Sequence, residues 1–86
     1  MPHTDQQQSD IPTPTPARPV RLAGAAPSLW RVIDASGRVI GHVQARAQAD
    51  GVRFRARRFR VATRAFMDLG EFWSVDDAID CLRFVR

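Results

Sequence analysis

The chain has 86 residues, with thirteen Lys plus Arg against nine Asp plus Glu, a formal net charge of +4 and a sequence pI near 11.3. This length excludes more than one small domain, and the single cysteine, Cys81, excludes an intramolecular disulfide and a cysteine-based metal cluster. No apolar run reaches the length of a signal peptide or a membrane span, so we expect a soluble cytoplasmic protein.

Every basic residue of the chain is an arginine. One interpretation is the codon bias of a high-GC genome, which needs no function. The other is anion recognition, because a guanidinium group can grip phosphate at two points where an ammonium group cannot. The placement of the arginines along the chain therefore matters more than their number.

Residues 1–27 are rich in proline and poor in apolar side chains. Prolines at every second position from Pro12 to Pro16 remove backbone donors and favour extended geometry, and few apolar residues are present to offset the entropy of ordering. The sequence predicts a disordered tail over 1–27 and one folded domain over 28–86. An alternative use of the tail is as a ligand for an aromatic groove of the SH3 type, since Pro16 and Pro19 have the required spacing.

Two runs rich in β-branched residues, 29–34 and 38–46, flank the turn residues 35–37, where Gly37 can supply a positive φ. This pattern predicts a hairpin in which Asp34 faces Arg38. In that register one face carries Leu29, Ile33, Val39 and Val43, which we expect under a helix, and the other carries Trp30, Val32 and Ile40 as a partly exposed strip. A shift of one residue would exchange the two faces.

The stretch 52–61 follows the Asp50–Gly51 turn signal and predicts a third strand. Val52, Phe54 and Ala56 alternate with Arg53, Arg55 and Arg57, so one face is apolar and the other basic. The alternation slips at Arg57 and Arg58. We interpret the slip as a β-bulge, after which Phe59 and Val61 continue the apolar face.

Residues 65–69 predict a further short strand, and Ser74 begins a C-terminal helix. The Ser74 hydroxyl can accept from the backbone N–H of Asp77, and acidic residues suit the first turn of a helix. An apolar stripe of Val75, Ala78, Ile79, Leu82 and Val85 recurs at helical spacing. The predicted fold is α+β, a small antiparallel sheet of three to four strands packed against one C-terminal helix.

The segment Leu69–Ala78, with its Leu-Gly-x-Phe start and acidic helix opening, is similar to the strand-to-helix junction of AP2-type plant DNA-binding domains and of the arm-binding domains of phage integrases. The resemblance covers about ten residues of the chain. It implies a sheet whose face away from the helix enters a major groove, with contacts from Trp30 and Arg31 on the first strand and from the arginines of the long strand. The first-strand Arg-Gly-Val-Arg pattern of the plant family is absent here.

Five arginines on neighbouring positions of one strand repel one another, so a compensating anion is expected. It could be phosphate, a partner's acidic residues, or this chain's own Asp34, Asp50, Asp68 and Glu71. Our leading hypothesis is a non-enzymatic nucleic-acid-binding module, for DNA more than RNA, with a salt slope of roughly −4 to −5 if about five phosphates are neutralised. The expected contact residues are Arg53, Arg55, Arg57, Arg58, Arg60, Arg31 and Trp30. The alternative is a protein-interaction adaptor or a homodimer formed through Trp30, Val32 and Ile40.

Other chemistry is not indicated by the sequence. His42 has no histidine near it in the sequence, Cys81 has no base beside it, and the helix aspartates are explained by capping, so we expect no metal site, no cofactor and no catalytic residues.

Overall fold

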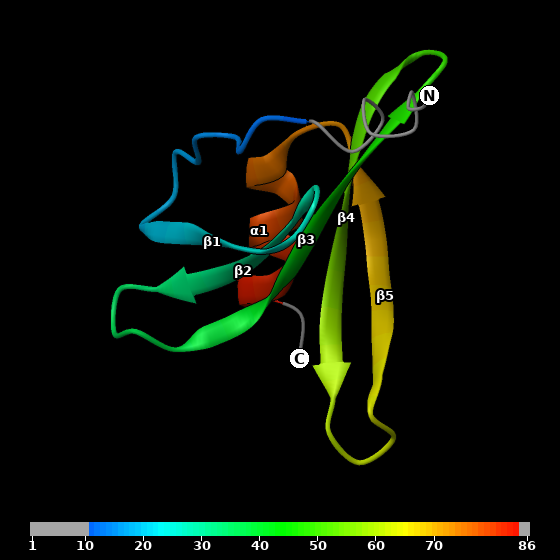
Figure 1. The fold of residues 1–86 in the computed structure, drawn as a ribbon. Helices are drawn as coiled ribbons and strands as arrows, with labels where there is room; N and C mark the ends of the chain where they lie inside the picture. The colour runs from blue at the N-terminus through cyan, green and yellow to red at the C-terminus, as the bar shows by residue number, and fades with distance from the viewer. Residues whose placement is uncertain (1–10, 85–86) are drawn as a thin grey trace, which may run out of the picture.

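The computed structural model describes residues 11–84, which form one sheet and one helix (Figure 1). The elements are β1 (Val20–Ala26), β2 (Leu29–Asp34), β3 (Val39–Gln48), β4 (Gly51–Arg60), β5 (Ala65–Phe72) and α1 (Val75–Phe84). All neighbouring strands are antiparallel, in the order β1-β2-β3-β4-β5. The α+β class is confirmed, but the sheet has five strands and not three to four.

The additional strand, β1, lies in the segment that the sequence analysis assigned to a tail. It pairs with β2 from Val20 opposite Asp34 to Ala26 opposite Leu29. Ahead of it, residues 11–19 cross the end of the molecule as a strap, while residues 1–10 of the predicted tail lie outside the described part of the chain (Figure 1).

The strap is attached by specific contacts. Thr13 Oγ1 accepts a hydrogen bond from Trp30 Nε1 at 2.9 Å, and both carboxylate oxygens of Asp80 accept from the Arg18 guanidinium at 2.8 Å. The hydrogen bond and the charge of Arg18 hold the pKa of Asp80 below its usual range. Arg18 and Thr13 therefore bind the strap to the folded domain. These contacts order the strap without an SH3-type groove of another protein.

The hairpin between β2 and β3 forms at the predicted turn. The backbone N–H of Asp34 donates to the carbonyl of Arg38 at 2.9 Å, and Gly37 has a φ of 91°, a conformation that glycine adopts without strain. The Asp34 carboxylate accepts from Ser36 and from the backbone of Arg38, which lowers the pKa of Asp34.

Beyond the turn, the predicted register is wrong by one residue. Ile33 faces Val39 as expected, but the register then shifts so that Val32 faces Gly41, which leaves Ile40 as an extra residue in β3. Trp30 and Val32 consequently turn toward the core, with exposed fractions of 4% and 0%. The expected exposed strip does not form.

Helix α1 begins as predicted, with Ser74 Oγ accepting from the backbone N–H of Asp77 at 3.1 Å. Its apolar stripe packs on the sheet, and Val85 lies outside the described residues. The core consists of Trp30, Val32, Val43, Ala45, Ala56, Val75, Ala78, Ile79 and Leu82. Leu82 lies so close to Gly41 that a side chain at position 41 would overlap its methyl groups. Glycine is thus required where the helix approaches β3.

The strand direction changes strongly from one edge of the sheet to the other. β1 and β2 cross the view at a large angle to β4 and β5, and the far end of the β4–β5 hairpin projects beyond the helix (Figure 1). α1 contacts β3, β4 and β5. One face of the sheet is therefore covered by α1, and the other has no helix over it within residues 11–84.

Candidate nucleic-acid interface

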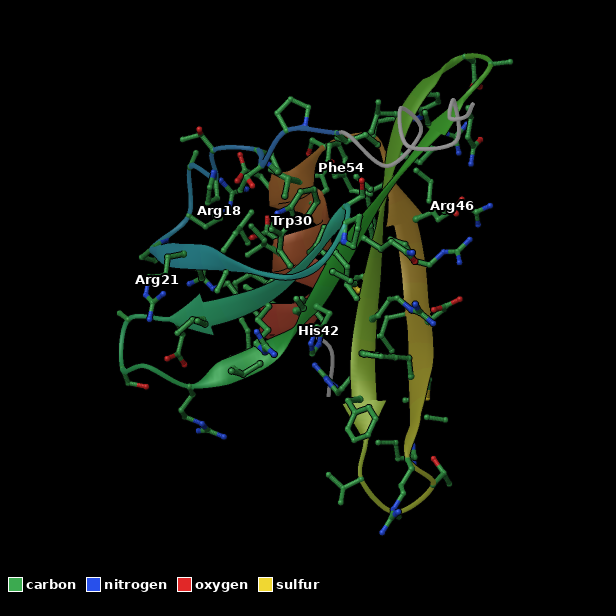
Figure 2. The ribbon with its side chains drawn as sticks, viewed as in Figure 1. Arg18, Arg21, Trp30, His42, Arg46 and Phe54 are labelled. Carbon is green, nitrogen blue, oxygen red and sulfur yellow. The ribbon has the colours of Figure 1, made fainter. Side chains whose placement is uncertain are left out.

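The uncovered face of the sheet carries a group of arginines, which we call the arginine face. Alternation along β4 places three of them together, and β2 and β3 contribute one each. Its members are Arg31, Arg46, Arg53, Arg55 and Arg57. Arg46 stands opposite Arg53 and points away from α1 (Figure 2). The predicted separation of an apolar and a basic face along β4 up to Arg57 is thus confirmed.

Three members of the arginine face form ion pairs with carboxylates of the same chain. Arg57 Nε lies 2.8 Å from an Asp68 oxygen, and Arg55 lies 2.8 Å from Glu71 and 3.5 Å from Asp68. Arg53 reaches Asp50 at 3.2 Å. These pairs lie on a partly exposed surface, where an ion pair contributes little stability. They order the guanidiniums and reduce the positive charge of the face.

Arg31 and Arg46 have no carboxylate partner among residues 11–84. Both residues are exposed, and Arg31 donates to the backbone carbonyl of Gly24 at 3.3 Å. Since three carboxylates oppose five guanidiniums, the arginine face keeps an excess of two positive charges. Arg46 was not among the predicted site residues. Its signal was present in the sequence, because His42, Gln44 and Arg46 alternate along one strand.

Three predicted site residues lie elsewhere. Trp30 is buried in the core and bound to Thr13 of the strap, so its ring is not available to a ligand on the arginine face (Figure 2). Arg58 lies on the helix side, where it donates to the carbonyl of Leu82 at 3.0 Å. Arg60 follows Arg58 in the alternation and donates to the sulfur of Met67 at 3.4 Å.

The reason for the displacement of Arg58 is the location of the β-bulge. The register of β4 and β5 shifts between Ala56 opposite Gly70 and Arg57 opposite Asp68, so the extra residue is Leu69 on β5. β4 keeps its regular alternation, which sends Arg58 to the helix side and Phe59 to the arginine face. The predicted bulge at Arg57 and Arg58 is therefore wrong.

Aromatic rings lie at both ends of the arginine face. At one end the Arg53 guanidinium stacks 3.7 Å from the ring centre of Trp73, which is 59% exposed. At the other end His42, Phe59 and Phe66 form what we call the ring cluster. Its Phe66 ring packs edge-to-face on His42, with centroids 4.9 Å apart, and on Phe59 at 5.4 Å.

His42 is the titratable member of the ring cluster. Burial lowers its pKa, and the positive charges of Arg31 and Arg57 lower it further, so the imidazole is neutral at pH 7. Its Nδ1 atom is buried and has no hydrogen-bond partner among the described residues. A buried nitrogen without a hydrogen-bond partner costs free energy of folding.

The acidic residues of α1 lie on the other side of the molecule from the arginine face. Asp76 accepts from the strap backbone at Ala17, and Asp80 pairs with Arg18 and Arg83. Within residues 11–84, no three His, Cys, Asp or Glu side chains gather as a metal site. The same part of the chain contains no helix with the length and apolarity that a membrane crossing requires.

Comparisons of this chain with family models, with curated proteins and with solved structures found no match.

Proposed function

We propose that this chain is a small non-enzymatic nucleic-acid-binding module that contacts phosphates through the arginine face. The observation that carries the proposal is the separation of charge. Five arginines and the exposed rings occupy the uncovered side of the sheet, while three aspartates lie on the helix behind it. A sheet face with excess positive charge attracts a polyanion, and guanidinium groups bind phosphate with two hydrogen bonds.

The internal ion pairs change the expected contacts. Phosphate must compete with Asp68 and Glu71 for Arg55 and Arg57, whereas Arg31 and Arg46 have no carboxylate to displace among residues 11–84. We therefore assign the first phosphate contacts to Arg31 and Arg46, with Arg53 third, because its Asp50 partner lies at a longer 3.2 Å. Arg58 and Arg60 are not part of this interface. The preference for DNA over RNA stays a prediction.

The test is the salt dependence of binding. Two to three neutralised phosphates give a slope of log affinity against log salt of about −2 to −3 for duplex DNA, shallower than five free arginines would give. Arg46→Gln should reduce that slope by about 1. The matched control is Arg83→Gln, which removes the same charge from α1 and should leave the slope unchanged. Absence of binding at low salt would refute the proposal.

A second candidate function, self-association, is favoured by the free end of the β4–β5 hairpin. Phe59, Val61, Phe66 and Met67 are between 36% and 78% exposed there. Exposed apolar side chains concentrated at one end of a hairpin are typical of a protein interface. This group replaces Trp30, Val32 and Ile40 as the expected contact.

Light scattering coupled to size exclusion distinguishes the two functions. A monomer at micromolar concentration contradicts self-association. A dimer that Met67→Ser dissociates, with DNA binding absent, would support it over the nucleic-acid proposal.

A further inference from the structure

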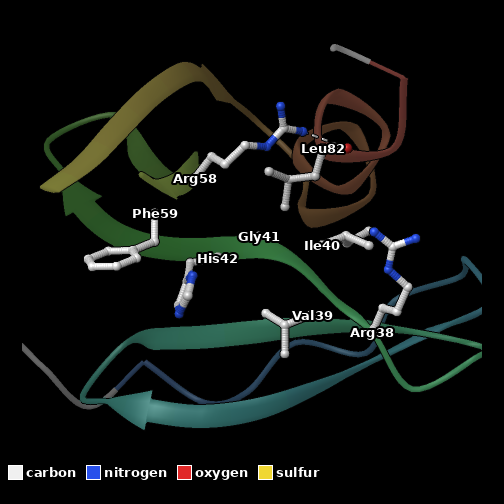
Figure 3. A pocket seen from close by; sticks show the side chains of 8 residues that line it. All are labelled: Arg38, Val39, Ile40, Gly41, His42, Arg58, Phe59 and Leu82. Atoms are coloured by element: carbon white, nitrogen blue, oxygen red, sulfur yellow. Dashed lines mark hydrogen bonds between the residues drawn. The ribbon is translucent and has the colours of Figure 1, made fainter. Parts of the chain in front are cut away.

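β3 and β4 separate at one end of the sheet and leave a wedge-shaped gap between them, which we call the wedge pocket. Pairing between these strands ends at His42 opposite Arg57, because the extra residue Ile40 directs the start of β3 toward β2 alone. The last residues of β4, from Arg58 to Arg60, pair only with β5. The space between the two strands is a pocket of about 350 Å³, with Leu82 of α1 at its base (Figure 3).

The wedge pocket joins the ring cluster to a basic rim. Phe59 and His42 line it from the arginine-face side, and Arg38 and Arg58 bring guanidinium groups to it. Figure 3 shows Arg58 held by its hydrogen bond to the Leu82 carbonyl. Among the described residues that line the pocket there is no carboxylate. This lining suits a ligand with a flat apolar body and negative charge beside it.

His42 brings a polar imidazole ring to the pocket wall, while its Nδ1 atom is covered and has no hydrogen-bond partner among residues 11–84. The edge of a nucleobase carries hydrogen-bond donors and acceptors around a flat ring. A base that enters the wedge could therefore stack on Phe59, which is 43% exposed, with its polar edge beside the His42 ring and the two guanidinium groups.

We propose that the wedge pocket receives one unpaired base of a single-stranded nucleic acid, stacked against Phe59, while the arginine face holds the flanking phosphates. The inference rests on the proposed function and narrows it. Paired bases of a regular duplex are stacked inside the helix and do not present a face to Phe59, whereas the bases of a single strand do. The volume is at the small end of known ligand pockets, which fits a single base.

The experiment measures the affinity for a single-stranded oligonucleotide and for its duplex at one salt concentration. Loss of one base–aromatic stack corresponds to a decrease of roughly 5- to 140-fold. Phe59→Ala should produce this decrease for the single strand and leave duplex binding unchanged. Phe84→Ala is the matched control, because Phe84 is an exposed ring of α1 outside the pocket. Arg46→Gln should weaken both oligonucleotides.

A second readout uses a milder substitution than truncation to alanine. A 2-aminopurine base within the single strand should gain fluorescence on binding, because it leaves the neighbouring bases that quench it. Phe59→Leu keeps an apolar side chain and removes the ring, so it should reduce this gain. Circular dichroism checks that each variant is folded.

Each result separates the inference from the function on which it rests. Equal affinity for both oligonucleotides, insensitive to Phe59 but reduced by Arg46→Gln, would overturn the base pocket and leave the nucleic-acid proposal standing. No binding of either oligonucleotide would overturn both. Dissociation of a wild-type dimer by Phe59→Ala, without nucleic-acid binding, would assign the ring cluster to self-association.

Discussion

On the face that α1 covers, Val32, Val43 and Ala56 have no exposed surface, whereas on the opposite face Arg53, Arg55 and Arg57 keep between 22% and 25% of their side chains in solvent. The same strands form both faces. The covered face is stabilised by burial, at about 1.5–3 kcal/mol for each large aliphatic side chain. The arginine face is ordered by lateral contacts, in which each of these guanidiniums meets a carboxylate.

The two faces therefore differ in which sequence changes they tolerate and in which ligands can act on them. The covered face is sensitive to changes in side-chain volume, because its interior is close-packed. The arginine face is sensitive to changes in charge, because the carboxylates that pair with its arginines are partly exposed and another anion can replace them. Three substitutions and one pH titration test this contrast between the two faces.

Ile79→Ala should be the most damaging change. Ile79 is fully buried in the middle of α1, so the truncation removes apolar contact and leaves a cavity, at about 2–5 kcal/mol of unfolding free energy. Urea denaturation measures the loss. The control on the exposed hairpin end, Met67→Ala, should change the unfolding free energy by about 0.5 kcal/mol or less. Similar losses for both variants would contradict the contrast between the covered core and the exposed hairpin.

Gly41→Ala tests the close approach of α1 to β3. A Cβ atom at position 41 would overlap the Leu82 methyl groups and lie 3.0 Å from the Arg57 carbonyl oxygen, so overpacking should cost about 1–3 kcal/mol. Gly24→Ala is the matched control, because nothing lies within 4 Å of a Cβ at that position. If thermal unfolding shows equal shifts for both variants, the glycine at position 41 is not required by packing.

Asp68→Asn should strengthen nucleic-acid binding by about two- to fivefold, because it releases Arg57 and one of the contacts of Arg55. The salt slope should become steeper by about 1. Asp77→Asn makes the same change in net charge on α1. An equal gain in affinity from both variants would show that net charge acts and the arginine face does not.

The smallest expected effect is a dependence of stability on pH. The folded-state pKa of His42 is lower than its ordinary value of 6.5, so the unfolded chain binds a proton first as pH falls. The free energy of unfolding should therefore decrease slightly from pH 7 toward pH 5, and His42→Gln should remove that part of the decrease. If the free energy of unfolding of the wild type increased from pH 7 to pH 5 relative to that of His42→Gln, the pKa of His42 would be raised and not lowered by folding.

Part of the candidate site could be predicted without coordinates. The alternation of Val52, Phe54 and Ala56 with three arginines determined that β4 has a basic face, because successive side chains on a strand point to opposite sides. The cap at Ser74 and the apolar stripe of α1 could also be predicted, because each depends only on residues that are close in the sequence. The grouping of His42, Phe59 and Phe66 was missed, since their proximity depends on the pairing of three strands.

A sheet with one C-terminal helix, and the separation of apolar from basic side chains along β4, can be predicted from the residues alone, because both follow from periodicities of a few residues. The folded chain was needed to establish which face holds Trp30, on which side Arg58 lies, that residues 20–26 add a fifth strand, and that carboxylates of β5 pair with Arg55 and Arg57. These features depend on strand pairing, and a single extra residue, at Ile40 in β3 or Leu69 in β5, shifts the pairing of two strands by one position. The location of such a residue is selected by packing across the whole sheet.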